Sequence, residues 1–349
     1  MKTQKISGMK IAMVYIGTVV GAGFATGQEI LQFFVLFGIG GLWGILLSTG
    51  GFILFGVLIM KIGLALSAKS HFEVLGQIGG PVFQMVMDGL IMISLFGGLT
   101  AMMAGTGALF GQQLGLPPLL GNALMGLLTA VTVLRGLRGV IAAISAVVPF
   151  LLSAVFGISL FTLKNAPPNF RLGLEGGGSG LLGNWLWAAI LYASYNILLS
   201  ASVLGPLGAN GGNRRRVLIG GALGGLGLGL ASLLIYLAIS ASGAETRHLE
   251  VPLLQMAMEI APLAGALFAL VLVAEIYTTA VGALYGFSAR LMERGRRQGR
   301  RKVVFTVTAA FFASLLGFSN LVRYLYPLQG YGGLLLLLAL LWAWRRGRI

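Results

Sequence analysis

The sequence predicts an all-α polytopic membrane protein with ten transmembrane helices. Of its 349 residues, 57% are hydrophobic and only 9% are charged, and the mean hydropathy is +0.93. Soluble domains carry about 25% charged residues, so this chain has too few polar side chains to cover a surface that faces water. Its 55 glycines are about twice the usual share, which favours close packing between membrane helices.

Ten segments can cross a bilayer, because a spanning helix needs about 20 mostly apolar residues. They are 9–37, 40–62, 82–112, 117–134, 139–163, 182–206, 217–241, 261–289, 303–319 and 326–344. The fourth and the ninth are the shortest. Segment 251–260 is too short to span, and we expect it to form an amphipathic surface helix between the seventh and eighth spans.

The distribution of basic residues supports these ten spans. With this division, 20 of the 24 lysines and arginines fall on one side of the membrane. The other side receives only Lys164, Arg171, Arg247 and Arg323. Loops rich in lysine and arginine face the cytoplasm, so the sequence predicts an integral membrane protein with both termini cytoplasmic. The same distribution accounts for the net charge of +15 without a nucleic-acid partner.

The longest loop on the opposite side divides the ten spans into five and five. This loop, 165–181, contains two consecutive prolines and a run of glycines. Residues 1–164 would form the first half and residues 182–349 the second. Because each half has an odd number of spans, the second half must be inverted relative to the first, so we expect an inverted repeat.

The first span is predicted to be broken near 21–26. Four glycines fall within eleven residues of it: Gly17, Gly21, Gly23 and Gly27. Each glycine costs about 1 kcal/mol in a helix interior relative to alanine, so this density favours an interruption. A break in hydrocarbon is tolerated only where the freed backbone groups line a cavity or bind a ligand. Secondary transporters hold their substrates between such half-helices.

Internal symmetry then predicts a second break in the sixth span. The segment 192–196, Tyr-Ala-Ser-Tyr-Asn, lies about as far into that span as Gly21 lies in the first. These residues are polar and form helices poorly inside a membrane. Gly205 and Pro206 predict a further interruption, which would end the helix nearer the cytoplasm.

These stretches resemble a known family. The run Gly17-x-x-Val20-Gly21-x-Gly23 resembles the first-helix signature of the LeuT-type fold, in which the first and sixth helices are broken. Residues 21–24, Gly-Ala-Gly-Phe, resemble the Gly-Ser-Gly motif of amino acid–polyamine–organocation permeases. Residues 25–30 and 192–196 are most similar to the YkvI-like amino-acid permease family. The architectural resemblance covers nearly the whole chain.

The resemblance implies a substrate site at the broken helices. The unwound first helix would present backbone amides to a substrate carboxylate, and a half-helix that starts near Thr26 would add a positive dipole end. Two other interpretations stay open, in which Glu29 only caps the half-helix and the polar residues of 194–196 only satisfy backbone exposed by the break. The predicted substrate-binding residues are Gly21, Ala22, Gly23, Thr26, Glu29, Ser194, Tyr195 and Asn196.

The resemblance also implies a sodium site. Carbonyl oxygens of Gly17 and Val20 would hold the ion together with the hydroxyls of Thr278 and Thr279, which are hard ligands suited to a hard cation. Glu275 lies one helical turn from the two threonines, and we include it with the coupling-ion residues. It could carry a proton, bind a cation, contact a substrate amine or make a structural hydrogen bond. Sodium and protons therefore both stay open as coupling ions, and no other cofactor is expected.

Asp88 is the third acidic residue inside a predicted span, near the cytoplasmic end of the third. A charge within the bilayer costs about 3 kcal/mol, so such residues are candidates for function. We expect Asp88 at a gate or beside a basic loop, without a defined role. Residues 220–229 contain a GxGxxG-like fragment, but no strand precedes it, so helix packing explains it better than dinucleotide binding.

These observations favour a secondary active transporter of a small zwitterionic solute, an amino acid, coupled to sodium or protons. A channel or a substrate sensor on the same scaffold is the alternative, although a channel needs a continuous polar stripe and a sensor usually has a soluble domain. An intramembrane enzyme is the third alternative. The chain has no cysteine and neither an HExxH nor a GxSxG motif, and Asp88 and Glu275 could act only if they met in space. The sequence does not predict an oligomeric state.

Overall fold

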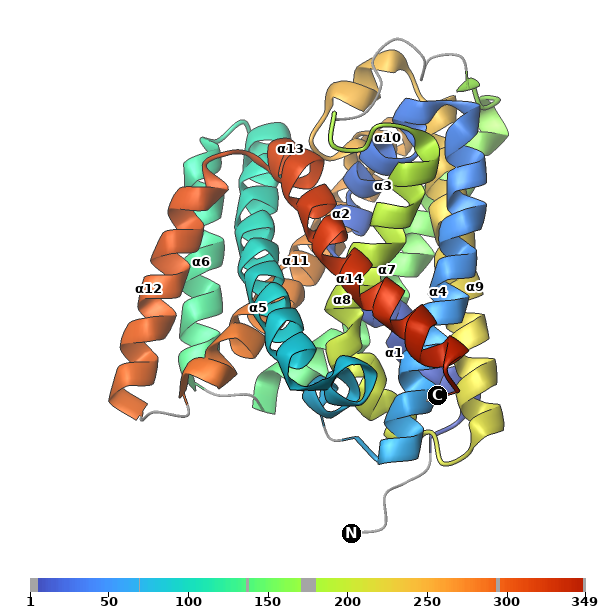
Figure 1. The fold of residues 1–349 in the computed structure, drawn as a ribbon. Coiled ribbons are helices and arrows are strands. Elements are labelled where there is room, and N and C mark those ends of the chain that lie inside the picture. Colours follow the sequence, from blue (N-terminus) through green and yellow to red (C-terminus); the bar gives the residue numbers. More distant parts are fainter. Residues whose placement is uncertain (1–5, 69, 136–137, 171–179, 293–295, 348–349) are drawn as a thin grey trace.

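The computed structural model describes residues 6–68, 70–135, 138–170, 180–292 and 296–347, and within these ranges one helix follows another (Figure 1). The helices are Gly8–Val19 (α1), Ala22–Ala25 (α2), Gln28–Phe33 (α3), Ile39–Leu66 (α4), His71–Leu114 (α5), Pro118–Arg135 (α6), Arg138–Asn165 (α7), Trp185–Asn210 (α8), Arg214–Ala241 (α9), Pro252–Ile260 (α10), Pro262–Met292 (α11), Arg296–Ser314 (α12), Phe318–Asn320 (α13) and Tyr326–Arg345 (α14). A π-helical turn, Leu321–Leu325, joins the last two. No strand occurs in these described ranges, which confirms the all-α prediction.

The molecule is a membrane protein. Within the described part of the chain, six helices are long and apolar enough to cross a membrane. They are Ile39–Leu66, His71–Leu114, Trp185–Asn210, Arg214–Ala241, Pro262–Ser288 and Phe318–Arg345. Every one of the ten predicted spans coincides with helical structure, although the other four are shorter or less apolar. The number ten for the membrane crossings therefore stays a prediction.

The ends of the helices form two groups, as Figure 1 shows. The lower ends of α4, α6, α8 and α11 lie at the same end of the molecule as the start of α1. In the sequence, these helix ends are followed by the predicted basic loops, and the order of the helices agrees with that grouping. Its assignment to the cytoplasm stays a prediction.

The first span is broken, as predicted. Helix α1 ends at Val19, and Val20 and Gly21 have extended backbone before α2 begins at Ala22. A second interruption follows at Gly27, whose φ of 82° lies in the left-handed region that favours glycine. Helix α3 then continues toward the upper end (Figure 1). The glycines therefore interrupt the span twice, on both sides of one short helical turn.

The predicted break at 192–196 is wrong, because α8 is continuous from Trp185 to Asn210. The polar side chains of this stretch are satisfied without interrupting the helix. Asn196 Nδ2 donates a hydrogen bond to the Tyr192 carbonyl at 3.0 Å, and Ser194 Oγ donates to the Gly330 carbonyl of α14 at 2.6 Å. Polar residues inside a membrane helix can bond their own helix or a neighbour, and the sequence does not distinguish this from a break.

Helix α8 also continues through Gly205 and Pro206, so the second predicted interruption is wrong as well. Its glycines serve the contact with α4. A Cβ at Gly208 would collide with the carbonyl of Met60, and a Cβ at Gly63 would collide with the carbonyl of Gly205. Glycine allows the two backbones to approach this closely, as it does in many membrane helix pairs.

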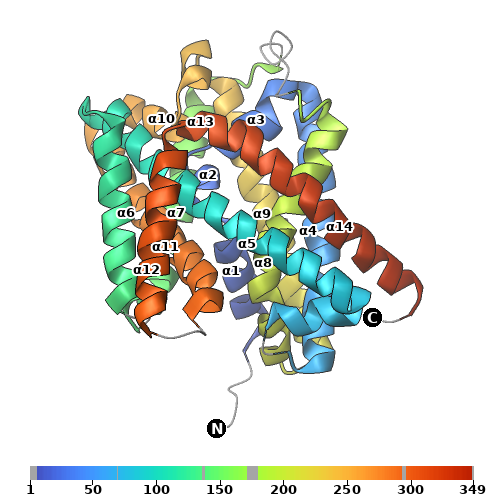
Figure 2. The same cartoon turned by 60° about the vertical axis from the view of Figure 1, so that its left-hand side comes forward.

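The glycines of 220–229 pack helices together, as predicted. A Cβ at Gly220 would lie 2.5 Å from Ile11 Cγ2, and a Cβ at Gly224 would lie 2.5 Å from Tyr15 Cδ1. Helix α9 thus lies directly against α1, and the Tyr15 hydroxyl donates to the Phe52 carbonyl of α4 at 2.8 Å. Helices α4 and α9 lie on one side of the broken span, and α6 and α12 lie on the other (Figures 1 and 2).

Segment 251–260 is helical, as predicted, and α10 covers the second interruption of the broken span. The Leu253 N–H donates to the Thr26 carbonyl at 3.1 Å. A Cβ at Gly27 would lie 3.1 Å from Leu253 Cγ. Five residues of α10, including Leu253 and Leu254, are buried, so its apolar side packs onto the bundle.

Candidate functional site

Glu29 lies at the centre of the broken span. It belongs to the first turn of α3, and only 4% of its surface is exposed. Tyr195 of α8 donates a hydrogen bond from its hydroxyl to Glu29 Oε2, and the Phe24 backbone N–H of α2 lies near this carboxylate. Gly23 makes room for it, because a Cβ at that position would collide with the carboxylate of Glu29. The carboxylate therefore folds back over α2 and links the two half-helices to α8.

Four aromatic rings surround this hydrogen bond, and we call them the aromatic cluster: Phe33, Tyr192, Tyr195 and Tyr326. The Tyr195 ring centroid is 5.2 Å from that of Tyr326, 5.6 Å from that of Tyr192 and 5.7 Å from that of Phe33. All four rings are buried. The Tyr192 hydroxyl faces Ser232 Oγ, but the two atoms do not form a hydrogen bond, and neither has another partner among the described residues.

The structure brings part of the predicted substrate site together. Gly23, Glu29 and Tyr195 are in mutual contact through the carboxylate. Thr26 is engaged locally, because its Oγ1 donates to the Gly23 carbonyl at 3.0 Å and accepts from the Gln28 N–H at 3.3 Å. This hydroxyl therefore stabilises the turn between the half-helices.

Ser194 and Asn196 bond backbone carbonyls. Ser194 is directed to α14, and Asn196 bonds the preceding turn of its own helix. Gly21 and Ala22 form the boundary between α1 and α2. Substrate binding by these four residues stays a prediction.

The predicted coupling-ion residues of α11 form a small oxygen cluster. Glu275 is 2% exposed, and its Oε1 accepts a hydrogen bond from Thr279 Oγ1 at 3.4 Å. Thr278 Oγ1 donates to the Glu275 carbonyl at 3.0 Å. Glu275 Oε2 has no hydrogen-bond partner in the described part of the chain. Such a buried, unsatisfied carboxylate oxygen is costly unless a cation or a proton neutralises it.

The break in the first span lies against this cluster. A Cβ at Gly21 would lie 3.9 Å from Thr279 Cγ2, which is ordinary van der Waals contact. Because α1 ends at Val19, its last carbonyls, including that of Gly17, lack donors from a following helical turn, while the Val20 N–H closes α1 on Ile16. The carbonyls at the end of α1 and the hydroxyl and carboxylate oxygens of α11 are ligands of the kind that a small hard cation prefers, and their joint binding of one ion stays a prediction. Among the described residues, no group of three histidine or acidic side chains forms a transition-metal site.

Asp88 lies elsewhere. Helix α5 bends at Gly80, whose φ is 77°, and the bend brings His71 Nε2 to 3.5 Å from Asp88 Oδ1. The pair links the start of α5 to the helix beyond its bend. This agrees with the expectation that Asp88 is not part of a central site, and it gives the proposed pairing of Asp88 with Glu275 no support.

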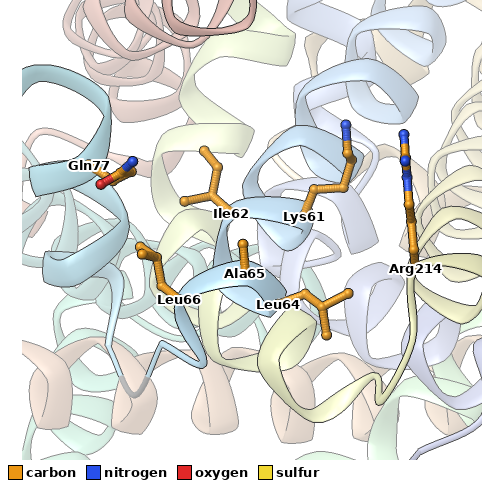
Figure 3. Close-up of a pocket in the computed structure, with 7 residues that line it drawn as sticks. All are labelled: Lys61, Ile62, Leu64, Ala65, Leu66, Gln77 and Arg214. Carbon is orange, nitrogen blue, oxygen red and sulfur yellow. The ribbon is translucent and has the colours of Figure 1, made fainter. Parts of the chain in front are cut away.

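A separate pocket of about 310 Å³ opens at the lower ends of α4, α5 and α9 (Figure 3). Figure 3 shows the side chains of Lys61 of α4 and Arg214 of α9 extending side by side in the same direction. Its lining is otherwise mostly apolar and includes none of the predicted site residues. The pocket is therefore separate from the site at the broken span.

Sequence reasoning missed most of the aromatic cluster. Phe33 follows Glu29 by one helical turn on α3, so its place beside the carboxylate could have been found from helical spacing. Tyr192 is one turn from Tyr195 on a helix that was expected to be interrupted there. Tyr326 lies in a distant part of the chain, and only the fold brings it to Tyr195.

The fold is that of the LeuT-type transporters. MhsT, solved in complex with L-phenylalanine, is similar with a TM-score of 0.62 and 19% identity, covering 95% of this chain and 88% of that one. Mhp1 in its inward-facing conformation is similar with a TM-score of 0.53 and 13% identity. The match covers 87% of this chain and 69% of that one. A mutant of the Eremococcus coleocola manganese transporter is similar with a TM-score of 0.58 and 14% identity. The match covers 96% of this chain and 76% of that one.

The chain is similar in sequence to two Bacillus subtilis (strain 168) proteins over almost its full length. It is 29% identical to the uncharacterized membrane protein YkvI over 345 residues, which are 98% of this chain and 97% of that protein. It is also 29% identical to the uncharacterized protein YyaD over 341 residues, 96% of each. No protein-family model matches the chain. The resemblance to YkvI and to the LeuT-type fold is thereby confirmed.

Proposed function

We propose that this protein is a secondary active transporter that carries a small amino-acid-like solute by cation-coupled alternating access. The observation that carries the proposal is the interrupted first span, whose buried carboxylate Glu29 is bonded by Tyr195 from another helix. In a LeuT-type fold, such an interruption at mid-membrane supplies the solute site. The solved complex of MhsT with L-phenylalanine supports a solute of this class, although the manganese transporter has the same fold.

We further propose that residues 1–164 and 182–349 are two inverted halves, joined by the linker 165–181. Alternating access would then consist of one group of helices rocking against another around the site. Helix α10 closes the upper side of the interruption through the bond from Leu253 to Thr26. Opening toward that side requires this contact to break.

The coupling ion proposed for the oxygen cluster is sodium, held by Gly17, Val20, Thr278 and Thr279, with Glu275 adding a negative charge. The unpartnered Glu275 Oε2 supports a cation here, because a bound ion would supply the missing positive charge. A proton on Glu275 would neutralise the same oxygen. Sodium is preferred because the neighbouring hydroxyls and free carbonyls are additional ligands that a proton does not need.

Thermal stability of the purified protein tests this proposal. A ligand that binds the folded state raises the melting temperature, so each common amino acid is added with and without sodium. We expect one class of amino acids to stabilise the protein, and to do so more strongly in sodium. Stabilisation that follows pH instead of sodium would favour protons. If no amino acid has an effect, the amino-acid assignment is contradicted.

Counterflow in proteoliposomes separates a transporter from a channel on the same scaffold. A carrier exchanges labelled external solute for unlabelled internal solute with saturation, whereas a channel shows neither exchange nor saturation. We expect saturable counterflow of the solute identified by thermal stability. Chemical conversion of the solute during the assay would instead favour an enzyme.

A further inference from the structure

Two acidic side chains are buried around the broken span, Glu29 and Glu275. Where the structure describes side-chain burial, these two are the acidic or basic side chains that are buried, and the lysines and arginines are at least partly exposed. A buried carboxylate that lacks a cationic partner is costly to keep charged. The site therefore favours ligands that bring positive charge.

Glu29 has neutral donors but no cationic partner. Its carboxylate accepts from the Tyr195 hydroxyl and lies near the Phe24 N–H, and it bonds no lysine, arginine or histidine whose contacts the structure describes. It also occupies the space beside Gly23 where the sequence predicted the carboxylate of the substrate. A substrate carboxylate placed there would meet a like charge at close range, which disfavours it.

The aromatic cluster also favours a cation at this site. The faces of aromatic rings are negative and attract cations within about 6 Å of the centroid, most strongly where water is excluded. Three buried tyrosine rings and Phe33 lie around the Tyr195–Glu29 bond. The unpartnered Tyr192 hydroxyl is buried in the same cluster and can accept a hydrogen bond. A carboxylate beside buried aromatic rings suits an ammonium group.

We propose that the group of the solute bound at Glu29 is a protonated amine, so that the site accepts cationic amines and engages amino acids through their amine. This deepens the proposed transport function and rests on it. The amine displaces or shares the hydrogen bond from Tyr195 and lies among the rings of Tyr192, Tyr195 and Tyr326. The carboxylate of a solute is not required for binding.

Matched ligands test this proposal. Each set consists of an amino acid, the amine formed by removing its carboxylate, and the acid formed by removing its amine. Leucine, 3-methylbutylamine and 4-methylpentanoate form one set, and phenylalanine, 2-phenylethylamine and 3-phenylpropionate form another. Binding is measured by thermal shift and calorimetry at pH 7 in fixed sodium. We expect the amine to bind at least as tightly as the amino acid and the acid not to bind.

The outcomes separate this inference from the proposed function. If an amino acid and its deaminated acid bind but the amine does not, the inference is wrong and the transport function stands. If the amino acid binds and both other members fail, both charged groups are needed, and the inference is again wrong. If no member of any set binds, the inference and the proposed solute class fail together.

Substitutions locate the effect. Glu29→Gln keeps the shape of the side chain and removes its charge. We expect amine affinity to fall by about 30-fold or more, which is the usual effect of losing one partner of a buried charge pair. Glu245→Gln is the matched control, because Glu245 is exposed in the short helix Ala244–His248, and it should leave affinity unchanged. Equal amine affinity in Glu29→Gln and the wild type would overturn the proposal.

A second variant keeps the test independent of the carboxylate. Tyr326→Leu removes one ring of the cluster and leaves both Glu29 and Tyr195 in place. We expect amine affinity to fall about 3- to 30-fold, in the range of a desolvated cation–aromatic contact. Unchanged amine affinity in folded Tyr326→Leu protein would contradict binding of the amine among these rings.

Discussion

At the residue scale, the absence of a side chain at Gly23 is as important as the presence of Glu29. The carboxylate lies where a Cβ would otherwise be, so the glycine and the acid form one unit. The sequence singled out both residues, one as a helix breaker and the other as a buried charge. It could not show that they touch, because residues six apart meet only through the turn at Gly27.

We expect Gly23→Ala to destabilise the protein by about 1–3 kcal/mol, because the added methyl group forces the Glu29 carboxylate away from Tyr195. Thermal unfolding in detergent measures the effect, and binding of the solute should weaken in parallel. Gly89→Ala is the control, because a Cβ at Gly89 meets no atom within 4 Å. Equal melting temperatures for the two variants would show that the close approach at Gly23 is unimportant.

The oxygen cluster gives a second prediction at this scale. Thr279→Val has nearly the same shape but lacks the hydroxyl that bonds Glu275, so we expect sodium to bind at least about tenfold more weakly. The sodium concentration that gives half of the maximal thermal stabilisation measures this change. Thr308→Val, at an exposed position of α12, should behave like the wild type. Unaltered sodium dependence in Thr279→Val would place the ion elsewhere.

At the element scale, the two broken helices of the prediction had different outcomes. In the first span, glycine density and a following carboxylate indicated an interruption, and both features are intrinsic to the segment. In the sixth span, the polar residues Ser194 and Asn196 also indicated an interruption. They instead bond backbone carbonyls, Asn196 within a continuous helix and Ser194 on the neighbouring α14. The partner of Ser194 is on α14, so the difference depends on tertiary contacts that the sequence does not show.

The glycines of α4 and α8 make a prediction about packing. We expect Gly63→Ala to destabilise the protein by about 2 kcal/mol or more, because the new Cβ would collide with the backbone carbonyl of Gly205, which cannot move as a side chain can. Gly50→Ala on the same helix meets open space and should be neutral or slightly stabilising. Thermal unfolding of the pair provides the comparison, and equal stabilities would contradict a close contact between the two helices.

At the scale of the whole molecule, the all-helical architecture was the most predictable feature. Each predicted span coincides with helical structure. Long apolar runs indicate where the membrane segments lie, and the basic loops indicate independently where they end. The assembly of the aromatic cluster was not predictable, since Phe33, Tyr195 and Tyr326 come from three distant parts of the chain. A single sequence shows which elements exist more readily than which of their faces meet.

The absence of cysteine makes the orientation easy to test. We expect Leu116→Cys, beyond the end of α5, to react with a membrane-impermeant thiol reagent in intact cells. Arg215→Cys, at the start of α9, should react only after the cells are made permeable. Both positions are exposed, so access depends on the side of the membrane. The reverse pattern would place the basic loops outside.

Solute uptake into proteoliposomes tests the central claim most directly, with the wild type and Glu29→Gln compared under an imposed sodium gradient. The solute is the one selected by thermal stability. The account predicts that the wild type accumulates it against its own gradient only when sodium is high outside, and that Glu29→Gln does not accumulate it. Equal accumulation by both proteins would contradict a solute site at Glu29, and purely downhill movement in the wild type would contradict sodium-coupled transport.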